Sequence, residues 1–78
     1  MKSRGQTKIG SSFGTAVRRR RHGLGLSQEE FAEKADIHRT YVSHIELGKT
    51  DIGLSVAKNI ADALQVPLSK LVKEAEGA

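Results

Sequence analysis

Apolar residues recur along much of this 78-residue chain at three-, four- and seven-residue spacings, the period of an amphipathic α-helix. Residues 1–8 are polar and lack this period, so we expect a flexible basic arm there. The first apolar stripe predicts a helix from residue 9 to Gly23 and Gly25, which should stop it. Its apolar members are Ile9, Phe13, Ala16, Val17 and Leu24.

Two shorter helices are predicted after these glycines. Ser27 and Glu30 have the spacing of a capping box, in which the hydroxyl caps the first turn and the carboxylate reaches back. A tight connection over residues 36–38 leads to a third helix over residues 39–47, which Gly48 should end. The inward residues are Phe31, Ala32 and Ala35 in the second helix and Val42 and Ile45 in the third.

Two more helices complete the pattern. A loop over residues 49–53 precedes a fourth helix over residues 54–64, and Val66-Pro67 then opens a fifth, because proline is well tolerated at a helix start. The inward residues of the fourth helix are Leu54, Ala57, Ile60, Ala61 and Leu64. Since no β-type alternation occurs, the sequence predicts a compact all-α domain of five helices over residues 9–74, with a frayed tail at 75–78.

Composition excludes several classes of protein. The chain has no cysteine, so it has neither a disulfide framework nor a cysteine-based metal finger. It has no apolar run long enough to span a bilayer, and its basic N-terminus lacks the apolar stretch of a secretory signal. We therefore expect a single small domain in the cytoplasm.

The net charge of +4 is unevenly distributed along the chain. Residues 1–26 hold seven Lys and Arg and no acid, whereas residues 27–78 hold six Lys and Arg and nine acids. The basic first third favours a polyanionic partner, most simply nucleic acid. It includes the run Arg18–Arg21, whose side chains spread over about 300° of a helix and cannot all face one DNA backbone.

The segment from Leu26 to Gly48 has the helix-turn-helix spacing of proteins that insert the second helix into the major groove of DNA. The outward face of this second helix consists of Arg39, Thr40, Ser43, His44 and Leu47. Arginine can pair bidentately with guanine, threonine offers a hydroxyl and a methyl group, and histidine can donate or accept a hydrogen bond. This face therefore suits base edges better than plain solvation.

The run LSQEEFAEKADIHRTYVSHIELGKT resembles the helix-turn-helix of the Cro/repressor (XRE) family, and the resemblance extends over residues 10–74. Within it, HRTYVSHIE is similar to restriction–modification controller proteins, which are small dimeric regulators. The resemblance implies a lambda-repressor-like fold and sequence-specific binding of double-stranded DNA. A phage-type repressor and a toxin–antitoxin autoregulator remain alternatives.

The family resemblance also implies roles for individual residues. The base-reading residues would be Arg39, Thr40, Ser43 and His44, and the phosphate-binding residues would be Ser27, Gln28, Tyr41, Lys49 and Arg21. Arg21 would in addition pair with Glu46 and so tie the first helix to the end of the third. A symmetric homodimer would form through the C-terminal helices, with interface residues among Leu64, Val66, Leu68, Leu71 and Val72.

The chain departs from the family pattern at four positions. Arg20 occupies a usually apolar position, so the first helix should pack less well there; we expect its side chain mostly in solvent or steering phosphate from a distance. His38 stands where controller proteins tend to have an acidic residue. Thr50 and Asp51 stand where several relatives have basic residues, so the loop over residues 49–53 should hold phosphate less firmly.

Other functions fit the residues less well. His22, His38 and His44 lack the spacing and companion ligands of a metal site, and we expect no cofactor. Adjacent Ser43 and His44 point in different directions, and no third group joins them, so we expect no enzyme and no small-molecule site. A helical protein-interaction module would need a more apolar third helix, and RNA binding by the arm would favour aromatic residues, which the arm lacks.

Overall fold

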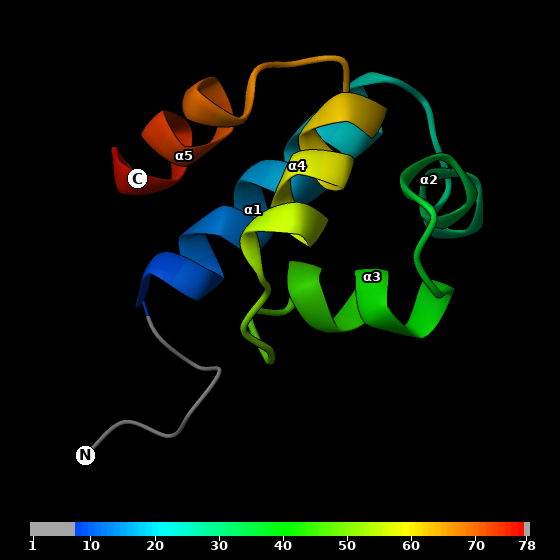
Figure 1. Cartoon of the computed structure of the whole chain (residues 1–78), viewed down its shortest axis with the longest axis horizontal. Coiled ribbons are helices and arrows are strands. Elements are labelled where there is room, and N and C mark those ends of the chain that lie inside the picture. The colour runs from blue at the N-terminus through cyan, green and yellow to red at the C-terminus, as the bar shows by residue number, and fades with distance from the viewer. Residues whose placement is uncertain (1–7, 78) are drawn as a thin grey trace.

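The computed structural model describes residues 8–77, and this part of the chain forms five helices and no strand (Figure 1). The helices are α1 (Lys8–Gly23), α2 (Gln28–Ala35), α3 (Arg39–Glu46), α4 (Leu54–Ala63) and α5 (Leu68–Glu76). The all-α architecture predicted from the apolar pattern is therefore confirmed.

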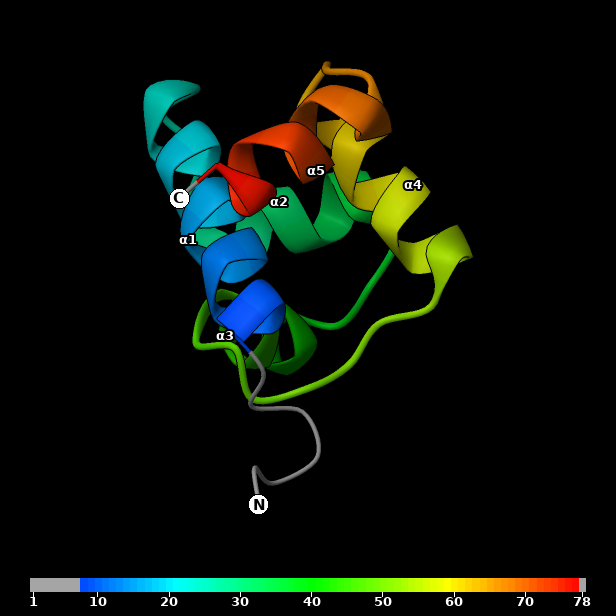
Figure 2. The same cartoon turned by 90° about the vertical axis from the view of Figure 1, so that its left-hand side faces the viewer.

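The long helix α1 organises the domain. It packs against both α3 and α5, which lie on opposite sides of it in the two views of the ribbon (Figures 1 and 2). The short helix α2 packs against α3 and α4. As a result, α3 lies at one edge of the molecule with one face on the core and the other directed outward.

Each helix contributes one of the five largest fully buried side chains to a common core. These side chains are Val17, Phe31, Val42, Ile60 and Leu71, each at most 1% exposed. Burial of such a side chain stabilises the folded state by about 1.5–3 kcal/mol, before any cost of ordering the chain. Because residues far apart in sequence share this core, the position of α3 depends on its packing against the other helices.

Two glycines allow α1 to lie very close to the end of α3. A β-carbon at Gly14 would overlap the carbonyl oxygen of Ile45 and lie 2.8 Å from that of Glu46. Gly48 has a φ of 70°, in the left-handed region that favours glycine, and a β-carbon there would lie 2.8 Å from the Ser11 Cα atom. The end of α3 is thereby pressed directly onto the backbone of α1.

Three side chains predicted to face inward are exposed instead. Leu54 is 78% exposed, because the first turn of α4 projects from the body of the molecule (Figure 2). Ile9 is 49% exposed in the first turn of α1, and Leu24 is 44% exposed just after its last residue. The helical period alone does not show where a helix extends beyond the neighbouring helices that would bury it.

The predicted boundaries also need correction at both ends. Lys8, assigned to the arm, begins α1, and residues 1–7 lie outside the described residues, as does Ala78. The tail was expected to fray from residue 75, but α5 continues to Glu76, and Ala75 is only 3% exposed. Packing of α5 on α1 keeps this last turn helical.

Arg20 is a further correction, since we expected this side chain mostly in solvent. It makes an ion pair with Glu74 of α5, in which its Nε atom donates to Oε1 over 3.0 Å. The pKa of Glu74 is lowered from its ordinary value, chiefly by this hydrogen bond. The pair links α1 to α5.

No helix among the described residues is both long and apolar enough to cross a membrane.

Candidate nucleic-acid interface

The turn between α2 and α3 is fixed by backbone geometry. Asp36 adopts a left-handed conformation with a φ of 57°, which ends α2. The Ile37 N–H then donates to the Ala32 carbonyl over 3.0 Å, and the Ile37 side chain packs against the core. The start of α2 has both hydrogen bonds of the predicted capping box between Ser27 and Glu30. The two helices therefore hold a defined angle to each other.

Helix α3 divides its residues between the core and the surface. Val42 and Ile45 are buried, as predicted, and Tyr41 is half-buried against the core. The proposed base-reading residues lie on the other side: Arg39, Thr40 and His44 are exposed and Ser43 is half-buried. The structure thus brings these four side chains together on the outward face.

A buried hydrogen-bond network fixes the end of α3 to α1 and α2. The Arg21 Nε and Nη2 atoms donate to the two carboxylate oxygens of Glu46 over 2.7 and 3.0 Å. Gln28 donates to Glu46 over 3.2 Å, and Arg21 also donates to the Leu26 carbonyl over 2.8 Å. This geometry confirms the predicted pair, and loss of one buried partner costs about 3–5 kcal/mol in comparable cases.

The same network changes the interpretation of the phosphate-binding residues. The Arg21 side chain is only 8% exposed and is directed at Glu46, so in this structure it is not presented to a phosphate. Gln28 is engaged with Glu46, and the Ser27 hydroxyl accepts the Glu30 N–H over 3.0 Å. Their phosphate contacts remain predictions, as do those of Lys49 and Tyr41; Lys49 is exposed just beyond α3.

His38 has a role that sequence reasoning missed. It is the N-cap of α3, and its Nδ1 atom accepts a hydrogen bond from the Thr40 N–H over 3.1 Å. Side chains that accept such a bond satisfy one of the free amides at a helix start. The position immediately before the helix was the available signal, but histidine is not a usual N-cap residue.

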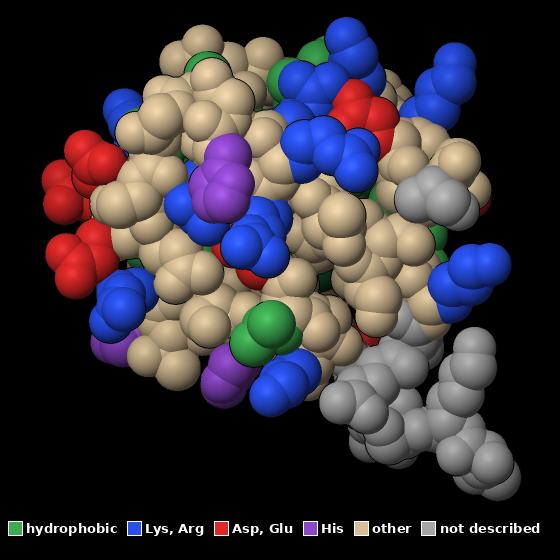
Figure 3. Space-filling model, turned by 180° about the vertical axis from the view of Figure 1, so that it is seen from behind, with side chains coloured by type: hydrophobic (Ala, Val, Ile, Leu, Met, Phe, Trp, Pro, Cys, Tyr) green, Lys and Arg blue, Asp and Glu red, His purple; other side chains and the backbone are tan. Residues whose placement is uncertain are grey.

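The charges around the interface are arranged asymmetrically. Acidic side chains gather at the edge where α2 lies, and basic ones are spread over the rest of the face seen in Figure 3. Glu29, in the first turn of α2, lies 4.0 Å from Arg39, with both side chains more than half exposed. A pair this exposed contributes little free energy, so it leaves Arg39 available for binding.

The pKa of Glu30 is lowered, mainly because its carboxylate accepts the Ser27 backbone N–H.

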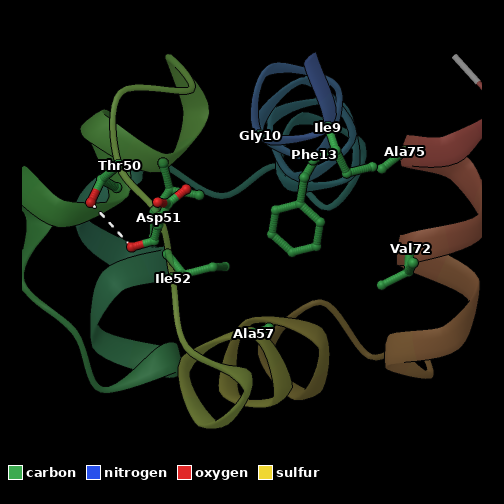
Figure 4. Close-up of a pocket in the computed structure, with 10 residues that line it drawn as sticks. Ile9, Gly10, Phe13, Thr50, Asp51, Ile52, Ala57, Val72 and Ala75 are labelled. Carbon is green, nitrogen blue, oxygen red and sulfur yellow. Dashed lines mark hydrogen bonds between the residues drawn. The ribbon is translucent and has the colours of Figure 1, made fainter. Parts of the chain in front are cut away.

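An apolar groove lies behind α3, on the side away from its outward face. Phe13, Ile52 and Val72 point into it from α1, the loop before α4, and α5 (Figure 4). Its volume is about 240 Å³. Among the described residues, no group of three potential metal ligands is placed to hold an ion.

Comparison with known proteins identifies the family. A model described as helix-turn-helix matches residues 17–71. Control protein C.MunI of Mycoplasma sp is 38% identical over 65 residues, which cover 82% of this chain and 88% of that protein. Control protein C.BamHI of Bacillus amyloliquefaciens is 42% identical over 55 residues, covering 69% of this chain and 68% of that protein.

A solved structure agrees with these sequences. The restriction–modification controller protein C.AhdI from Aeromonas hydrophila superposes with a TM-score of 0.76 at 33% identity, covering 78% of this chain and 92% of that one. The resemblance inferred from residues 26–50 is thereby confirmed. The chain belongs to the XRE-type helix-turn-helix family of DNA-binding transcription regulators, and within it resembles the restriction–modification controller proteins.

Proposed function

We propose that this protein binds a near-palindromic operator in double-stranded DNA as a homodimer and regulates transcription in the manner of a restriction–modification controller. The outward face of α3 carries the proposal. Its polar side chains are exposed together, while the buried Arg21–Glu46–Gln28 network holds the helix that presents them. A rigidly presented polar helix is suited to the major groove, which is about 12 Å wide.

The residue roles follow from exposure and chemistry. Arg39 would pair with a guanine edge, and Thr40, Ser43 and His44 would contact neighbouring bases. Lys49 and Tyr41 would bind phosphate, and Gln28 and Ser27 would do so at the start of α2 if their internal hydrogen bonds leave a donor free. Arg21 would not bind phosphate, contrary to expectation, because its guanidinium is buried against Glu46.

The dimer interface must differ from the one first expected. Leu64 and Leu71 are 3% and 0% exposed and belong to the core of one chain, so neither is presented to a partner. Val66 and Leu68 are half-buried, and Val72 is 37% exposed at the rim of the apolar groove. These three, together with the groove, form our proposed interface. An operator with half-sites one helical turn apart would require the two recognition helices of this dimer to lie about 34 Å apart.

The controller role is favoured over the alternatives by the relatives named as control proteins. A phage-type repressor or a toxin–antitoxin autoregulator would use the same interface with DNA. A protein-interaction module would not, since the outward face of α3 is polar rather than apolar. We expect no catalysis, and we expect the protein to act in the cytoplasm.

Selection of bound duplexes from a random DNA pool tests the proposal. We expect a near-palindromic consensus whose half-sites are centred about one helical turn apart, roughly 10 base pairs. Affinity should decrease steeply with salt concentration, because phosphate contacts release counterions. Recovery of no consensus would contradict sequence-specific binding, and a single unpaired half-site would contradict the dimer.

A further inference from the structure

Leu47 has an exposed side chain that is not part of the hydrophobic core. It caps the end of α3 and is 59% exposed, whereas Val42 and Ile45 make the core contacts of this helix. A polar residue would serve folding equally well at this position. An exposed leucine alone is ordinary, so its location decides whether it has a function.

Leu47 lies on the outward face of α3, at its C-terminal end. Its backbone is in the right-handed helical region, so it continues the helix. Seven residues at about 100° each bring it back to within about 20° of Thr40, with His44 and Ser43 on either side. It is therefore an apolar side chain in line with the polar residues that would contact bases, one helical turn beyond them.

The backbone around Leu47 is fixed. Its N–H donates to the Ser43 carbonyl over 3.1 Å. The next residue, Gly48, is buried and lies against Ser11 of α1. Because the position is held before binding, contact made by this side chain would require little further ordering.

The major groove offers an apolar partner to such a side chain. Among the base edges displayed there, only thymine carries a methyl group, at C5. We propose that Leu47 packs against the C5-methyl group of a thymine in each half-site, and so is a specificity-determining residue of this protein. The proposal rests on the proposed function, in which α3 enters the major groove.

Replacement of thymine by deoxyuridine tests this contact, because it removes the methyl group and leaves the hydrogen-bonding edge unchanged. Each thymine of a selected operator duplex is replaced in turn, together with its symmetry mate, and the Kd is measured by fluorescence anisotropy at fixed salt. With the unaltered chain, one such position should lose about fourfold in affinity per methyl group, the value of one buried methylene. With Leu47→Ala, the same replacement should have no effect.

Leu24→Ala is the matched control, since this leucine is similarly exposed but lies between α1 and α2. This variant should keep the full deoxyuridine effect. If no thymine is sensitive, or if Leu47→Ala retains the loss at the sensitive position, the inference is wrong although sequence-specific binding stands. If no duplex is selected at all, the proposed function itself fails.

Discussion

Arg39 and Lys49 are exposed basic residues, one at the start of α3 and the other just beyond its end, yet they should contribute to binding in different ways. A guanidinium that pairs with a guanine edge favours one sequence over others, whereas an ammonium on a phosphate binds every sequence equally. The difference can be measured, because both side chains are accessible and neither is part of the core.

Arg39→Ala should weaken binding to the selected operator by about 1–3 kcal/mol and binding to random DNA very little. Lys49→Ala is the control. It should weaken binding to the operator and to random DNA to a similar degree, and it should reduce the slope of log K against log salt concentration by about one, because one phosphate contact is lost. Titrations of both duplexes at several salt concentrations separate the two effects. Equal losses on both duplexes for Arg39→Ala would remove its base-reading role.

Gly14 gives a second prediction at this scale. Gly14→Ala should destabilise the domain by about 1–3 kcal/mol or more, because the new methyl group meets backbone oxygens of α3 that cannot rotate away. Gly23→Ala is the matched change, since nothing lies within 4 Å of that position; its effect should be within about 1 kcal/mol and favourable. Urea unfolding measures both, and similar stabilities would refute the close approach.

At the scale of elements, α5 is fastened to α1 by the core and by the Arg20–Glu74 ion pair. The lowered pKa of Glu74 means that the folded state favours the ionised carboxylate. Stability from this source is fully present above the ordinary pKa near 4.5 and is lost as the pH decreases through the lower folded-state pKa. Both side chains are partly exposed, so solvent screens the pair.

Glu74→Gln should therefore lower stability at pH 7 and flatten the loss of stability as the pH decreases below the ordinary pKa near 4.5. Part of the acid loss should remain, because the pKa of Glu30 is lowered as well. Thermal unfolding across this range provides the measurement. An unchanged acid profile in the variant would show that the Arg20–Glu74 pair does not contribute in solution.

At the scale of the whole molecule, two neighbouring residues of α5 should respond in opposite ways to the same change. Val72→Glu places a charge at the exposed rim of the groove, so the chain should stay folded but become monomeric in analytical ultracentrifugation. Leu71→Glu buries an unpaired charge in the core and should prevent folding.

Leu24→Glu controls for the added surface charge and should remain dimeric, because Leu24 lies away from the groove. Circular dichroism reports whether each variant is folded. A folded Val72→Glu protein that still sediments as a dimer would place the interface elsewhere.

The sequence predicted the helices more accurately than it predicted which of their residues are buried. Helical period and the capping box at Ser27 were sufficient for five helices, because both depend on nearby residues. The same period assigned Leu54 to the core, since it contains no information on where a helix extends beyond its neighbours. For the site, the outward face of α3 was predictable, whereas the capping role of His38 required the observed hydrogen bond.

By itself, then, the sequence determined the all-α class, the helix-turn-helix and the polar residues that face outward, since these follow from spacing within single helices. Only the tertiary structure decided between alternatives that require two distant segments to meet. It buried the Arg21 guanidinium away from any phosphate, paired Arg20 with Glu74, and enclosed Leu64 and Leu71 in one core. Whether a charged or apolar side chain is available to a partner depends on what the fold places beside it, and local spacing does not contain that information.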